Sequence, residues 1–153
     1  MPIRDFPFGA FNFLVDIKSS DGSSDSPAAG FSDVTGLGAE FTMAEYRNGN
    51  EALNHVRKIS GLHKVSDVTL KRGVIGSTAF WEWITQQHTQ GRNAKRDVQI
   101  RLRGEDGAVV QTWTLQNASV LKHTGPTLAA KGGTDVAMEE LVLTVEGLDV
   151  TIP

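Results

Sequence analysis

The sequence predicts a mainly β fold, an antiparallel β-sandwich or barrel with one α-helix packed on it. In most of the periodic segments apolar and polar residues alternate, which is the pattern of strands with one buried and one solvated face. Only one segment carries apolar residues at helical spacing. Clusters of Gly, Asn, Asp, Ser and Pro separate these segments and supply turns.

Length and composition predict a single domain spanning residues 1–153. The chain is 39% hydrophobic and 22% charged, and a domain of this length buries a core without cross-links. It has no cysteine, which excludes disulfides, zinc fingers and thiol catalysis. No run approaches ~18 apolar residues, and the first ten residues lack the apolar stretch of a secretory signal. We therefore expect no membrane binding by this chain, and folding in the cytoplasm.

The first predicted strand covers residues 11–18, where Val15 and Ile17 lie on one face and Asp16 on the other. Residues 19–30 are rich in Ser, Asp and Gly, which predicts a solvated loop.

The next segments predict a hairpin with a long tip. After a short strand at 31–34, alternation runs over 39–46 and resumes at 63–72, so we expect the last two to pair. The polar and basic connection between Asn48 and His63 is unusually long. Long ordered loops are usually functional or interfacial.

Residues 78–88 form the predicted helix, with Ser77 as N-cap and Gly91 just after its end. Its sheet-facing positions, at i, i+3, i+4 and i+7, are Phe80, Trp83, Ile84 and Gln87. Trp81 points elsewhere, and it either covers the rim of its own domain or anchors a contact with another subunit.

Strands return in the last third of the chain. A second hairpin is predicted around the turn at Glu105, Asp106 and Gly107. The predicted strands are 97–103, 109–115, 118–122 and 136–145, with a loop of small residues at 128–134.

The residues that carry chemistry form no recognisable catalytic or metal-binding pattern. The four histidines, which lack the spacing of a metal site, are His55, His63, His88 and His123. The adjacent carboxylates Glu139 and Glu140 point to opposite faces of a strand, so they cannot flank one bond. No nucleophile elbow or phosphate-binding loop is present. We expect no cofactor, no metal and no enzymatic activity.

Charge is distributed unevenly along the chain. Residues 1–46 have 2 basic and 7 acidic side chains, residues 47–103 have 11 and 4, and residues 104–153 have 2 and 7. A basic segment in an acidic protein suits nucleic acid or the acidic segment of an identical neighbour. Because no aromatic residues are interleaved with the basic run near residues 92–103, nucleic-acid readout is not favoured.

Six short motifs, spread over nearly the whole chain, carry a family resemblance. They are FGAFNF at 8–13, GFSDVTGL at 30–37, EYRNG at 45–49, VTLKRGV at 68–74, FWEWI at 80–84 and ELVLTVEGL at 140–148. In order and spacing they resemble the tail tube proteins of contractile phage tails and of phage-like contractile injection systems.

The resemblance implies a structural subunit whose homo-hexameric rings stack into a hollow tube, each subunit lending strands to a continuous inner barrel. The implied partners are the sheath, baseplate and terminator or cap proteins, with a cargo protein or DNA in the lumen. After cytoplasmic assembly the protein would belong to a phage tail or a released injection particle. The alternatives left by the residues alone are a small-ligand-binding β-barrel and a hydrolytic enzyme of unknown type.

We predict that the wet faces of the strands line the lumen, because a water-filled tube needs polar side chains inside and a core behind them. The predicted lumen-facing residues are Glu40, Thr42, Asp67, Thr69, Lys71, Gln99, Arg101, Thr112 and Thr114.

The basic connection within 48–63 is predicted to be an inter-subunit loop that seeks an acidic surface on a neighbouring copy. Its candidate contact residues are Asn48, Asn50, Glu51, Asn54, His55, Arg57, Lys58 and His63.

Overall fold

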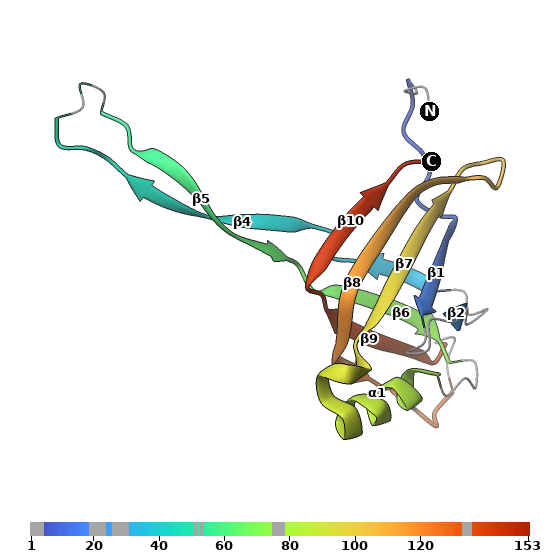
Figure 1. Ribbon diagram of the computed structural model, residues 1–153. Helices are drawn as coiled ribbons and strands as arrows, with labels where there is room; N and C mark the ends of the chain where they lie inside the picture. The colour runs from blue at the N-terminus through green and yellow to red at the C-terminus, as the bar shows by residue number, and fades with distance from the viewer. Residues whose placement is uncertain are drawn as a thin grey trace.

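The computed structural model describes residues 5–18, 24–25, 31–50, 52, 54–74, 79–132 and 136–153. Within them lie ten strands, one α-helix and one 3₁₀ turn (Figure 1). The strands are β1 (Phe13–Lys18), β2 (Ser24–Asp25), β3 (Phe31–Thr35), β4 (Ala39–Tyr46), β5 (Arg57–Val65), β6 (Val68–Gly73), β7 (Arg96–Arg103), β8 (Val109–Thr124), β9 (Met138–Thr144) and β10 (Gly147–Thr151). The helices are α1 (Ala79–Gln90) and η1 (Gly91–Ala94). Among these residues, no helix has the length and apolar character needed to cross a bilayer.

Eight of the ten described strands form two antiparallel layers joined by β8, and β4 and β5 pair in a separate two-stranded sheet. The order is β2-β1-β7-β8-β9-β6-β3, and β10 also pairs with β8. We call β2, β1, β7, the first half of β8 and β10 sheet A, and the second half of β8 with β9, β6 and β3 sheet B. The predicted antiparallel β-sandwich with one helix is confirmed.

The change of partner along β8 occurs at Asn117, whose φ of 52° is in the left-handed region that Asn tolerates. Before it, β8 pairs with β10, and after it with β9. Asp97 Oδ1 accepts a hydrogen bond from the Asn117 backbone N at 3.0 Å, and Asn117 Nδ2 donates to Glu146 at 3.0 Å. The Lys95 ammonium, which donates to Glu146, and the Asn117 amide lower the pKa of Glu146 below its usual value.

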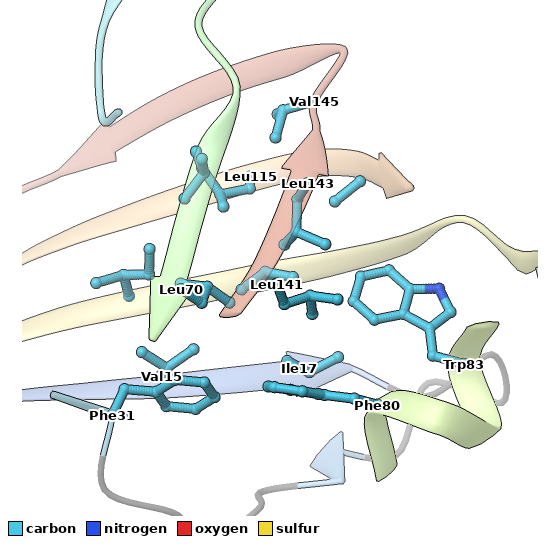
Figure 2. Close-up of a cluster of buried hydrophobic side chains, with 14 of the residues drawn as sticks. Val15, Ile17, Phe31, Leu70, Phe80, Trp83, Leu115, Leu141, Leu143 and Val145 are labelled. Carbon is cyan, nitrogen blue, oxygen red and sulfur yellow. The ribbon is translucent and has the colours of Figure 1, made fainter. Parts of the chain in front are cut away.

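The core fills the space between the two sheets. Figure 2 shows Leu70 and Leu141 of sheet B pointing toward Val15 and Ile17 of sheet A. Other fully buried members are Val68, Val98, Leu115 and Leu143. Burying one such side chain contributes roughly 1.5–3 kcal/mol. The two layers are therefore held by a continuous apolar interior.

Helix α1 packs on the sandwich with its predicted apolar face, and Phe80 and Trp83 are buried against the core. The Trp83 indole donates to the carbonyl of Ala94 at 2.9 Å. Gln87 donates to the Val120 carbonyl at 2.9 Å and accepts from its N–H at 2.8 Å, which fixes the helix to β8. Gly91 follows the helix with φ 59°, as its predicted C-terminal position requires. Ser77 lies outside the described residues.

A buried arginine joins the first turn of α1 to sheet B. The guanidinium of Arg72 lies 3.8 Å from the ring centroid of Phe80 and donates from Nε to Glu139 at 2.5 Å. The other oxygen of Glu139 lies 3.4 Å from His123 Nε2. A charge buried this deeply is tolerated because a carboxylate and an aromatic face compensate it.

The first hairpin differs from the prediction. Strand β4 pairs with Arg57–Val65, and the chain turns at Ser66 and Asp67 before β6 enters sheet B. The single strand predicted at 63–72 is therefore wrong. It spans two strands with different partners, and the straight alternation concealed the break between them.

The second hairpin, β7–β8, is confirmed, with Gly107 at φ 84° in its turn. The strands predicted at 109–115 and 118–122 are one strand, β8. Strand β10 was not predicted, although its sequence continues the apolar pattern of β9 after the turn at Glu146.

Replacing Leu141, which is fully buried, with Ala should lower the free energy of unfolding by about 2–5 kcal/mol, because the surrounding core cannot close the cavity. Leu121→Ala, at a largely exposed position of β8, is the matched control and should cost less than about 1 kcal/mol. Urea denaturation followed by circular dichroism at low protein concentration measures both. Equal losses would contradict the buried position of Leu141.

Candidate assembly surfaces

The outer face of sheet A is a polar surface made of cross-strand rows. Strand register places one side chain from each of four neighbouring strands side by side. One row is Asp16, Gln99, Thr114 and Asp149, and the next is Leu14, Arg101, Thr112 and Thr151. The opposite face of the same strands carries the core residues, so this face is the solvated side of the layer.

The charges on this face are partly neutralised within it. Arg101 Nη2 donates to Asp16 Oδ2, and Gln116 Nε2 donates to Asp149 Oδ2 at 3.3 Å. Asp16 is nearly buried, whereas Arg101 is half-buried. Arg101 thus compensates the charge of Asp16, whereas Asp149 keeps its charge because Gln116 is neutral, and most of the other side chains in the two rows are hydroxyls and amides.

The structure separates the nine predicted lumen-facing residues. Four of them, Gln99, Arg101, Thr112 and Thr114, share the outer face of sheet A. The others lie elsewhere: Thr69 and Lys71 on the outer face of sheet B, Glu40 and Thr42 on β4, and Asp67 in the β5–β6 connection. Because a sandwich has two solvated faces pointing in opposite directions, the nine do not form one surface.

Strands β4 and β5 form an arm that projects away from the sandwich (Figure 1). We call residues 39–65 the arm. Every residue of β4 is exposed, and so is every residue of β5 except Val65 at the base. Its apolar side chains lie on both faces: Phe41 and Met43 on one, Tyr46 and Ile59 on the other. Such a hairpin leaves much more apolar surface in water than an isolated domain normally does.

The predicted inter-subunit loop largely coincides with this arm, but part of it is strand. Arg57, Lys58 and His63 belong to β5, and His63 stacks near Phe41 with ring centroids 4.9 Å apart. The remaining described residues of that set, in the tip between the strands, are Asn48, Asn50, Asn54 and His55. Glu51 lies outside the described residues.

A β-bulge explains why the sequence did not reveal β5. The register shifts between Phe41 and Met43, so the neighbours Gly61 and Leu62 interrupt the pairing. A β-carbon on Gly61 would stand 2.7 Å from the Thr42 carbonyl oxygen, which shows how closely the two backbones approach there. Because the bulge adds one residue to β5, the apolar residues Ile59 and Leu62 are three positions apart instead of two or four, and the sequence of β5 does not alternate.

Sheet A has open edges on both sides of its solvated face. Among the described strands, β10 pairs with β8 alone, and β2 pairs with the end of β1 alone. Within the described part of the chain, no three His, Asp or Glu side chains gather in a way that would hold a metal ion. The surfaces that the structure offers are thus suited to association.

The sequence profile described as "T4-like virus tail tube protein gp19" matches residues 9–149. The chain belongs to this family. It is similar to a chain of the cryo-EM sheath–tube complex of PVC, an extracellular contractile injection system in the extended state. That chain is 25% identical, over 97% of this chain and 94% of that one, with a TM-score of 0.81. The family resemblance inferred from the six motifs is confirmed.

Another similar chain comes from the anti-feeding prophage cap, the terminating cap of its tube, at 25% identity over 100% of this chain and 96% of that one, with a TM-score of 0.81. Hcp1 from Flavobacterium johnsoniae shares the fold, at 13% identity over 92% and 96% of the two chains and a TM-score of 0.55. None of the curated proteins matches the chain significantly. This tail tube protein is a structural subunit of the inner tube of a phage tail or contractile injection system.

Asp16→Asn should destabilise the tail tube protein by about 1–2 kcal/mol, because it removes the charged partner of the half-buried Arg101. Asp149→Asn, on the exposed end of the same row, is the control and should have little effect. Thermal unfolding of the two variants at neutral pH makes the comparison. A larger loss from Asp149→Asn would contradict the importance of the Asp16–Arg101 pair.

Proposed function

We propose that this tail tube protein forms homo-hexameric rings that stack into a hollow conduit for a cargo protein or DNA. The proposed partners are a sheath around the tube, a baseplate at one end, and a terminator or cap at the other. Similar chains occur in a PVC sheath–tube complex, in a sheath/tube terminator and in the cap of an anti-feeding prophage tube, which supports these partners. Assembly takes place in the cytoplasm before the particle is released or joins a phage tail.

Ring closure uses the open edges of sheet A. If β10 of one copy lies beside β1 of the next, the strands β1, β7, β8 and β10 of all copies form one continuous barrel. Closure removes the unpaired backbone groups that would otherwise invite uncontrolled pairing. The polar face with Gln99, Arg101, Thr112 and Thr114 then lines the lumen, and sheet B faces outward.

The observation that carries the proposal is the arm. A two-stranded hairpin is marginally stable in water by itself, and this one has apolar side chains on both faces with no sheet beneath them. Contact with neighbouring copies covers those side chains and stabilises the arm. A ligand-binding barrel receives no comparable support, because the space between the sheets is packed with side chains.

Shortening the arm tests its role. In the structure Met43 pairs with Ser60, so replacing residues 44–59 with Asn-Gly joins the strands through a two-residue turn at that pair. The variant should keep its cooperative unfolding and lose only the circular dichroism signal of the deleted strand residues, because no core residue lies within 44–59. Negative-stain microscopy should show tubes from the unmodified chain and none from the variant. Tubes of ordinary length from the shortened chain would contradict the role of the arm in assembly.

Cysteine labelling tests the lumen, since the chain has no cysteine of its own. In assembled tubes, Thr112→Cys should react with a small maleimide and remain protected from a polyethylene-glycol maleimide too bulky to enter. Lys122→Cys, on the outer face of sheet B, is the matched control and should react with both reagents. Protection of Lys122→Cys with free bulky labelling of Thr112→Cys would reverse the assignment of inside and outside.

A further inference from the structure

A cleft of about 740 Å³ lies on the outer face of sheet B, between the strands and residues 125–132 and 136–137. Its floor includes a cross-strand row of Asp33, Lys71 and Glu140. Its apolar wall includes Leu128 and Val136, which are 81% and 74% exposed. Two carboxylates around one lysine, next to uncovered aliphatic side chains, suit a partner that is both apolar and cationic.

The arm offers that chemistry on one of its faces. Register places Tyr46 opposite Arg57 and Ala44 opposite Ile59, so the distal half of this face combines an aromatic, an aliphatic and a cationic side chain. The opposite face is less cationic, because its Lys58 lies directly across from Glu45.

The arm of a copy leaves the sandwich at one end of sheet B, whereas its own cleft begins at the middle of the strands. The arm leaves the sandwich where β3 ends at Thr35 and β6 begins at Val68, joined there by the Ser66 N–H donating to the Gly38 carbonyl at 3.0 Å. The cleft lies toward the other ends of the same strands, and Figure 1 shows the arm extending away from the body. The arm is therefore placed to reach another copy.

We propose that the Tyr46–Ile59 face of the arm docks into the outer cleft of a neighbouring copy. Tyr46 and Ile59 pack against Leu128 and Val136, and Arg57 lies beside the carboxylates of Asp33 and Glu140. The two surfaces are different, so the contact is head-to-tail and repeats from copy to copy. The inference rests on the proposed tube assembly and names the surface that receives the arm.

Disulfide trapping locates the contact, because a disulfide forms only where two β-carbons come within about 3.5–4.5 Å. Ala44→Cys with Leu128→Cys, in the otherwise cysteine-free chain, should give a ladder of cross-linked copies when assembled tubes are mildly oxidised. Two matched pairs should give a several-fold lower yield of cross-linked copies. The first, Met43→Cys with Leu128→Cys, uses the other arm face. The second, Ala44→Cys with Leu121→Cys, uses the groove beside α1.

A charge exchange provides an independent measurement. Arg57→Glu and Glu140→Lys should each reduce the rate of tube growth several-fold in light scattering, and the double variant should recover it. Arg57→Glu combined with Glu105→Lys, in the β7–β8 turn, should show no recovery.

Cross-linking of assembled tubes through either matched pair instead would contradict the docking site. So would tubes that show neither Ala44–Leu128 cross-links nor recovery of growth in the double variant. Either result leaves the proposed tube itself intact. Failure of the unmodified chain to form rings or tubes overturns the proposed assembly itself, and the docking site with it.

Discussion

The fold depends on one strand that belongs to both layers. Because β8 changes partner at Asn117, the sheet that carries the polar face and the sheet that carries the outer cleft share a backbone. The hydrogen bonds of Asp97 and Glu146 to Asn117 fix the bend, and Gln87 fixes α1 to the strand just beyond it. The core, the helix and the two outer faces are thus positioned relative to one another by a single element.

The sequence predicted the strands and the helix correctly where burial of one face makes apolar residues recur at a regular spacing. Strand β7 and helix α1 each bury one face, so Val98 and Ile100 follow period 2 while Phe80 and Trp83 follow the helical period. The bend of β8 escaped prediction because Asn117 interrupts an alternating pattern in the same way as a loop would. Strand β10 was missed although Leu148 and Val150 alternate with Asp149 and Thr151, because it is only five residues long and follows β9 after a short turn.

The candidate surfaces were predicted only in part, because the alternation of polar and apolar residues does not show to which sheet a solvated side chain belongs. Alternation reports which side chains avoid the core, but it does not say which of two solvated faces they join. It grouped Thr69 with Thr112, although sheet pairing places them on opposite sides of the molecule. The connection at 48–63 was predicted to be an inter-subunit loop from its length and basic character, whereas strand β5 within it was hidden by the bulge at Gly61.

The composition of β5 also bears on the protein before it assembles. An exposed hairpin with Ile59 and Leu62 in its outer strand is the kind of segment that nucleates aggregation. Here Lys58 and Lys64 stand close to those two residues along the strand, each across from a glutamate of β4, and such charged pairs disfavour the stacking of apolar strands. Charged residues that flank apolar positions of a strand in this way are the usual gatekeepers against uncontrolled strand pairing.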